Sequence, residues 1–87
     1  MDIEFSRSAA KFLQSADRPT RSRVKAGILG LIQQPPIGDI KVLQGWKPLL
    51  CRLRIGKYRV VYSYLQRKSG DTYLYIRDIG ARGGIYK

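Results

Sequence analysis

The stretch LLCRLRIGKYRVVYSYL, residues 49–65, decides the expected fold of this chain. Apolar residues alternate with arginines before Gly56, and a run rich in valine and tyrosine follows it. Alternation with a period of two is typical of strands, and a short glycine-containing segment between two such runs is typical of a tight turn. We therefore predict a β-hairpin in which Arg52 and Arg54 project from one face and the leucine and isoleucine side chains from the other.

The sequence that follows the hairpin continues the β-rich pattern. The polar run from Gln66 to Asp71 predicts a loop, and the run from Thr72 to Ile79 predicts the last strand. Three consecutive strands joined by short connections favour an antiparallel meander.

Toward the N-terminus the spacing of the apolar residues changes from that of a strand to that of a helix. Residues 3–5 predict a short first strand, and Ser6 or Ser8 can cap a helix that runs to about Ala16. Apolar residues at spacings of three and four mark one face of this helix, which we expect to be buried.

A second helix is expected to begin close behind the first. Either Pro19 occupies its first positions or Thr20 caps it, and it runs to about Gln33. Gly27 and Gly30 weaken it as an isolated helix by about 1 kcal/mol each relative to alanine. We expect these glycines to allow close packing against the first helix.

The predicted fold class is α+β, with the order β-α-α-β-β-β. The N-terminal strand and the helical hairpin pack on an antiparallel sheet. A length of 87 residues fits one domain, which we assign to residues 1–87.

The charge of the chain predicts a polyanionic partner. Seventeen Lys and Arg residues against six Asp and Glu residues give a formal net charge of +11. Residues 1–44 carry a balance of +3 and residues 45–87 a balance of +8, so the positive charge is concentrated in the second half. An uneven basic surface is typical of nucleic-acid binding, and a solvated basic surface that aids solubility is the alternative.

The residue inventory excludes several kinds of chemistry. Cys51 is the only cysteine, which rules out an intrachain disulfide and a cysteine-based metal site. Histidine is absent, so the usual general base and the usual zinc ligand are missing. We expect no metal and no cofactor. The N-terminus has neither a basic nor an apolar signal region, and no apolar run is long enough to span a membrane, so we expect a cytoplasmic protein without membrane contact.

Three arginines gather at the predicted hairpin. Arg52 and Arg54 share one face of a strand, and Arg59 follows the turn on the next strand. Cross-strand neighbours lie about 5 Å apart, so the three guanidinium groups would repel one another unless an anion lies between them. A phosphate backbone suits this geometry, because each guanidinium presents a planar fork of donors. A single arginine would more simply be a solvated side chain, but the cluster favours phosphate binding.

The glycine-rich ending IGARGGIYK, residues 79–87, contributes Arg82 and Tyr86. Glycines allow the backbone to approach a ligand closely. Tyr86 can stack on a base or close the sheet as an apolar side chain, and its spacing favours neither.

Together these segments resemble toxins of the RelE/ParE superfamily. The resemblance rests on the N-terminal Ile3-Glu4-Phe5-Ser6, on Leu43-Gln44-Gly45, on the hairpin from Cys51 to Tyr62, and on the ending from Ile79 to Tyr86. It covers essentially the whole chain, and its pattern is specific because all the parts occur in order.

The resemblance implies a toxin of a type II toxin–antitoxin system. In the RelE branch such toxins are ribosome-dependent endoribonucleases that cut mRNA in the A site through attack of the 2′-hydroxyl. The catalytic positions carried over to this chain are Arg52, Arg54, Arg59, Arg82 and Tyr86. We expect further RNA contacts from Lys47, Lys57 and Lys87. The implied partners are the ribosome, mRNA and a cognate acidic antitoxin.

This chain departs from the RelE pattern where a proton acceptor is needed. Arg52 and Arg54 stand where the family often has lysine, and Ala81 stands where histidine or lysine is common. Arginine stays protonated, so it stabilises charge but abstracts a proton poorly. The proton acceptor is then Tyr86 or a group of ribosomal RNA. Two other functions stay open on the same fold: inhibition of DNA gyrase, as in ParE toxins, and nucleic-acid binding without catalysis.

Overall fold

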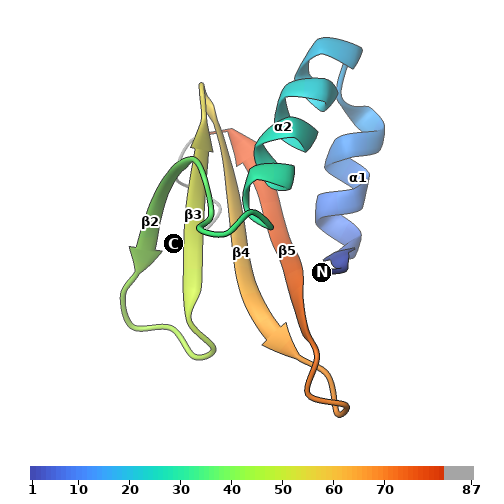
Figure 1. Ribbon diagram of the computed structural model, residues 1–87. Helices are drawn as coiled ribbons and strands as arrows, with labels where there is room; N and C mark the ends of the chain where they lie inside the picture. The colour runs from blue at the N-terminus through green and yellow to red at the C-terminus, as the bar shows by residue number, and fades with distance from the viewer. Residues whose placement is uncertain (82–87) are drawn as a thin grey trace.

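A five-stranded β-sheet with both helices on one of its faces forms the described part of the chain, residues 1–81 (Figure 1). The elements of this computed structural model, in chain order, are β1 (Ile3–Phe5), α1 (Arg7–Ser15), α2 (Arg18–Gly30), β2 (Asp39–Leu43), β3 (Leu50–Ile55), β4 (Tyr58–Gln66) and β5 (Thr72–Ala81). The predicted α+β class is confirmed, with one strand, β2, in addition to those expected from the sequence.

The strands lie in the order β1-β5-β4-β3-β2. Strands β2 to β5 form the antiparallel meander, and β1 pairs with β5 in parallel at the other edge. The sheet is therefore mixed and not entirely antiparallel. Strands β1 and β2 lie at opposite edges, and the two helices connect them across one face of the sheet. Strand β2 was not predicted from the sequence, because its apolar period is weak. It is an edge strand in which only Ile40 and Leu43 are partly buried.

Both helices begin at side-chain caps. The Ser6 hydroxyl accepts a hydrogen bond from the backbone N–H of Ala9 at 3.1 Å. The Asp17 carboxylate accepts one from the N–H of Thr20 at 3.0 Å, and this bond lowers the pKa of Asp17. Asp17 thus caps α2 in place of Thr20, and Pro19 lies in the first turn as predicted, where its missing N–H has no cost.

The glycines of α2 pack against different neighbours from those we expected. A Cβ atom at Gly27 would lie 2.5 Å from Cδ1 of Ile55 on β3, and one at Gly30 would lie 2.8 Å from the carbonyl oxygen of Ile37. The prediction that these glycines pack against the first helix is therefore wrong. They allow α2 to approach the sheet and the segment that leads into β2.

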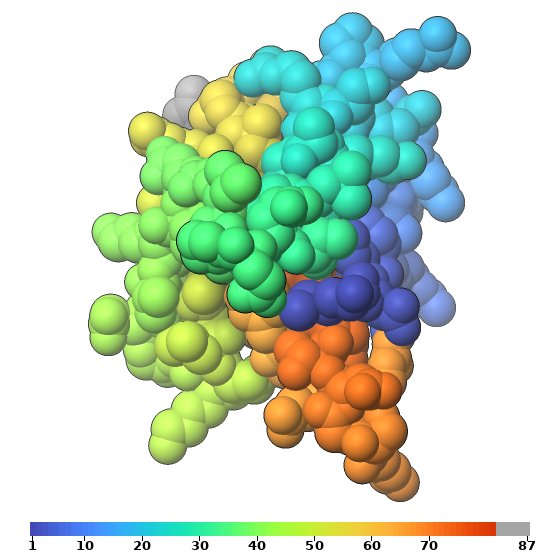
Figure 2. All heavy atoms as spheres, viewed as in Figure 1, coloured from blue at the N-terminus to red at the C-terminus, as the bar shows by residue number. Residues whose placement is uncertain are grey.

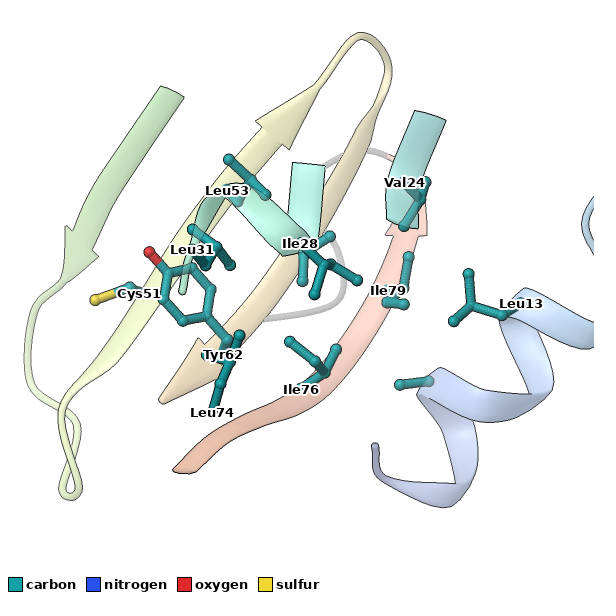
Figure 3. Packing of buried hydrophobic residues seen from close by; sticks show 12 residues of the cluster. Leu13, Val24, Ile28, Leu31, Cys51, Leu53, Tyr62, Leu74, Ile76 and Ile79 are labelled. Atoms are coloured by element: carbon teal, nitrogen blue, oxygen red, sulfur yellow. The ribbon is translucent and has the colours of Figure 1, made fainter. Parts of the chain in front are cut away.

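The hydrophobic core lies between the helices and the sheet (Figure 3). Leu13 of α1, two side chains of α2 and Leu31, which follows α2, face alternate residues of β3, β4 and β5. The core residues labelled in that view are Leu13, Val24, Ile28, Leu31, Cys51, Leu53, Tyr62, Leu74, Ile76 and Ile79. Figure 2 shows the helical side of the molecule, which covers these residues. The alternate residues of the same strands project from the opposite face, which no described helix covers and which we call the open face.

Candidate nucleic-acid interface

The strand register places the predicted arginines on the open face. Arg54 lies opposite Arg59 in the β3–β4 pair, and Arg52 lies opposite Val61. Their strand neighbours Leu53 and Val60 point into the core, so the intervening arginines must point away from it. We call Arg52, Arg54 and Arg59 the arginine cluster.

An acidic residue of β2, Asp39, lies beside the arginine cluster. Asp39 is the register partner of Arg54. The Nε atom of Arg54 donates to Oδ2 of Asp39 at 3.0 Å, and a terminal nitrogen of Arg52 lies 3.9 Å from Oδ1. Asp39 thus supplies part of the negative charge that we expected a phosphate to supply.

The two strand β3 arginines differ in exposure. The side chain of Arg52 is 12 % exposed, whereas that of Arg54 is 53 % exposed, similar to the 51 % of Asp39. Arg54 is therefore the more accessible member of the pair. Arg52 lies deeper, where its charge is less screened by water.

The predicted lysine contacts are placed in different parts of the molecule. Lys57 lies in the β3–β4 turn, with its ammonium group 5.5 Å from the ring centroid of Tyr58. That ring packs edge-to-face on Phe12 of α1, so Lys57 lies toward the helical layer. Lys47 is exposed in the loop between β2 and β3. Arg82, Tyr86 and Lys87, the remaining predicted site residues, lie outside the described residues.

The ionisable groups of the core are not arranged for proton abstraction. Burial raises the pKa of the Tyr62 hydroxyl, and burial likewise raises the pKa of Tyr64, whose hydroxyl donates to the carbonyl of Leu31 at 2.7 Å. Burial also raises the pKa of the Cys51 thiol. Each of these groups is held in its protonated form at neutral pH, so none of them is suited to act as a general base.

Within residues 1–81, no three His, Cys, Asp or Glu side chains are close enough to hold a metal ion together. None of the helices in this range is long and apolar enough to cross a membrane.

Sequence reasoning missed Asp39 and Arg77 on the open face. Asp39 was missed because β2 was not predicted, so nothing placed this residue beside the hairpin. Arg77 was missed because it lies at an irregularity of β5 that alternation alone does not reveal. The alternation of Asp39, Ile40 and Lys41 was the available signal for the first.

The sequence matches the family described as the ParE toxin of the type II toxin–antitoxin system parDE, over residues 3–86. It matches no curated protein.

Solved structures share the fold at low sequence identity. The isolated RelE toxin of E. coli is 22 % identical, with a TM-score of 0.68 over 98 % of this chain and 89 % of that chain. A RelB–RelE antitoxin–toxin complex from Methanococcus jannaschii contains a chain that is 22 % identical, with a TM-score of 0.66 over 95 % of this chain and 94 % of that one. The toxin–antitoxin complex RelBE2 from Mycobacterium tuberculosis gives 20 % identity and a TM-score of 0.67, over 93 % and 96 % of the two chains.

Proposed function

The chain belongs to the ParE toxin family of type II toxin–antitoxin systems, and from its arginine cluster and the likeness of its fold to that of RelE toxins we propose that it is a ribosome-dependent endoribonuclease that cleaves mRNA in the A site. The observation that carries the proposal is the position of Arg54 opposite Arg59, with Arg52 beside them, on the open face. Guanidinium groups in this arrangement suit a phosphodiester, because each offers a planar pair of donors. The site of action is then the cytoplasm.

The proposed reaction is a transfer of the phosphodiester to the neighbouring 2′-hydroxyl. The bond between the 2′-oxygen and phosphorus forms while the bond from phosphorus to the 5′-oxygen breaks, which gives a cyclic phosphate and a 5′-hydroxyl. The 2′-hydroxyl loses its proton to an acceptor, and the leaving 5′-oxygen gains one. The arginines hold the phosphate in line and neutralise the charge that develops on it.

The proton acceptor in this proposal is Tyr86 or a group of ribosomal RNA. Arginine is a poor base, and desolvation raises the pKa values of Tyr62, Tyr64 and Cys51. The contribution of Arg52, Arg54, Arg59 and Arg82 is therefore electrostatic. Such stabilisation is commonly the largest single contribution to catalysis.

The test is induced expression followed by primer extension on a translated message. The proposal expects cuts that are phased with the codons. We expect Arg82→Ala to abolish the cuts without changing the thermal unfolding midpoint, because the sequence around it, from Gly80 to Gly84, contains almost no other side chain that could contribute to a core. Arg18→Ala, on α2, removes the same charge from an exposed position and serves as the matched control. Full toxicity of the Arg82→Ala protein would overturn the assignment of Arg82.

A second candidate function, inhibition of DNA gyrase, is favoured by the match of residues 3–86 to the ParE toxin family. Gyrase inhibition requires binding but no nuclease site. Relaxed or cleaved plasmid together with intact message would support it over mRNA cleavage. An absence of any toxicity from the wild-type chain would instead leave nucleic-acid binding without catalysis.

We also propose that the chain binds a cognate acidic antitoxin. The net charge of +11 favours an acidic partner, and RelE chains of known structure are found in complexes with RelB. A groove between β1 and the two helices exposes Phe5 and is lined by Arg21 and Lys25, which suits a segment that carries apolar and acidic side chains. A reading frame for a small acidic protein beside the gene, and salt-sensitive binding of its product, would support this partner. A neighbouring product that does not bind the chain would contradict it.

A further inference from the structure

Strand β5 contains an irregularity at which two consecutive residues share the open face. Tyr62 pairs with Ile76, but the preceding residue of β4, Val61, pairs with Asp78, so Arg77 is the extra residue of a β-bulge. Ile76 and Ile79 on either side both point into the core. The bulge therefore turns Arg77 and Asp78 toward the face that carries the arginine cluster.

The Arg77 side chain contacts an aromatic ring from a loop that connects two strands distant from β5 in the sheet. Its guanidinium carbon lies 5.2 Å from the ring centroid of Trp46, within the range of a cation–π interaction. Trp46 belongs to the loop between β2 and β3, whereas β5 lies two strands beyond β3 in the sheet. The ring must therefore reach Arg77 across the open face.

Two hydrogen bonds hold this arrangement in place. The Ser63 hydroxyl of β4 donates to the carbonyl oxygen of Leu49 at 2.9 Å, which fixes the end of the loop that carries Trp46. The Ser6 hydroxyl at the start of α1 donates to the carbonyl oxygen of Arg77, which fixes the backbone at the bulge. Arg77 is thus positioned at its backbone by Ser6 and at its guanidinium by Trp46.

The guanidinium of Arg77 is still available to a ligand. Its side chain is 45 % exposed, and it forms only a long ion pair, at 3.8 Å, with Asp78, whose carboxylate accepts a hydrogen bond from the Ser8 hydroxyl at 2.9 Å. A cation held against a ring face keeps the edge of its guanidinium plane free to donate.

The position of Arg77 relative to the arginine cluster suits one extended strand of RNA. Val61 lies between Arg52 on β3 and Asp78 on β5, and adjacent strands are about 4.8 Å apart, so these two positions are separated by about 10 Å. We propose that Arg77, positioned by Trp46, is a second phosphate-binding site on the open face and contacts the backbone of single-stranded RNA next to the nucleotide held by the arginine cluster. This inference rests on the proposed RNA-binding function.

A purely structural role for the contact between Arg77 and Trp46 would change stability and not RNA binding. If the contact only closes the loop over the sheet, Arg77→Ala would lower the thermal unfolding midpoint and leave RNA binding per folded molecule unchanged. A phosphate contact instead changes how binding depends on salt, because each neutralised phosphate releases counterions.

The experiment measures binding of a short 2′-O-methyl RNA by fluorescence anisotropy over a range of salt concentrations. The 2′-O-methyl group blocks the attacking hydroxyl, so binding is separated from cleavage. We expect Arg77→Ala to weaken binding about tenfold and to reduce the slope of log K against log salt by about 0.7. Arg77→Lys should keep the slope, since the charge remains, and lose part of the affinity. Trp46→Leu should weaken binding while keeping the slope.

Arg18→Ala is the matched control, since it removes one positive charge from the helical side. An Arg77→Ala protein with the affinity and slope of this control would overturn the inference, and so would a wild-type chain that does not bind the oligonucleotide. Cleavage of ribosome-bound message is measured separately. A wild-type chain that binds through Arg77 but does not cleave would contradict the proposed function and leave the inference intact.

Discussion

At the scale of single residues, Asp39 determines the charge that the arginine cluster presents. Its carboxylate lies 3.0 Å from Arg54 and 3.9 Å from Arg52, in the place that a phosphate oxygen would take. An exposed ion pair of this kind contributes little to stability, about 0–1 kcal/mol. Its larger effect is to compete with an incoming phosphate for the same donors.

We predict that Asp39→Asn strengthens binding of single-stranded RNA by up to about fivefold, because the competing carboxylate is removed. The free energy of unfolding should fall by less than about 1 kcal/mol. Anisotropy with the 2′-O-methyl RNA and thermal unfolding measure the two effects. Asp71→Asn makes the same charge change in the β4–β5 loop and should bind as the wild type does. Unchanged binding by Asp39→Asn would contradict this competition, and weaker binding would show instead that Asp39 organises the arginines for RNA.

Cys51 gives a prediction about pH. It is 9 % exposed, and burial raises the pKa of its thiol above the ordinary value of 9.0, an effect that the Tyr62 hydroxyl partly offsets. The unfolded thiol ionises at a lower pH than the folded one. This contribution to stability is therefore complete below the unfolded pKa and is lost as the pH rises toward the folded pKa.

Two measurements follow for Cys51. At pH 8 the native thiol should react with a thiol reagent far more slowly than the same thiol in urea. The free energy of unfolding should decrease less with rising pH between pH 8 and 10 in Cys51→Ala than in the wild type. Rapid labelling of the native protein would contradict the burial of this side chain.

At the scale of elements, the approach of α2 to the sheet depends on Gly27 and Gly30, but the two positions differ in what lies beside them. A Cβ at Gly27 would meet the tip of the Ile55 side chain, which can rotate away. At Gly30 it would meet the carbonyl oxygen of Ile37. That segment is held by a hydrogen bond from the Ile37 N–H to the Gly30 carbonyl at 2.9 Å. Backbone fixed in this way cannot yield as a side chain does.

We therefore predict that Gly30→Ala destabilises the protein by about 1–3 kcal/mol, as overpacking does. Gly27→Ala should change the free energy of unfolding by less than about 1 kcal/mol, because the higher helix propensity of alanine offsets the movement of Ile55. Urea denaturation of both variants tests the ranking. Equal destabilisation would mean that Ile55 is as fixed as the backbone.

At the scale of the whole molecule, the two faces of the sheet differ in the side chains that they carry. The helical face holds the hydrophobic core, and the open face carries the arginine cluster together with Lys41 and Arg77, against Asp39 and Asp78. Basic residues thus predominate on the face that no described helix covers. Such an asymmetric charge distribution favours rapid association with a polyanion and makes it sensitive to salt.

We predict that log K for single-stranded RNA falls linearly with log salt with a slope of about −1.4, as expected for two neutralised phosphates at about 0.7 each. One phosphate is held by the arginine cluster and the other by Arg77. Titrations between low and high salt measure the slope, with Arg18→Ala as the control for a general effect of net charge. A slope near zero would contradict electrostatic binding by this face.

The sequence predicted most of the fold and part of the candidate site. The hairpin from β3 to β4 was predicted because Gly56 separates a run in which apolar residues alternate with arginines from a run rich in valine and tyrosine, and such local patterns are a property of the sequence itself. The presence of Arg52, Arg54 and Arg59 on one hairpin followed from the same period. Strand β2 was not predicted, since an exposed edge strand leaves little apolar pattern.

Only the tertiary structure decided which distant residues join these arginines. Asp39 reaches Arg54 through the pairing of β2 with β3, and Trp46, from the β2–β3 loop, reaches Arg77 on β5 across β3 and β4. Neither contact has a local signal, because strand pairing and a β-bulge bring together residues that are far apart in the chain. The sequence by itself determined the alternation, the caps and the positive charge. The register of the assembled sheet decided that Asp39 partly neutralises Arg52 and Arg54. It also decided that Arg77 lies against Trp46, where we propose that it binds a phosphate.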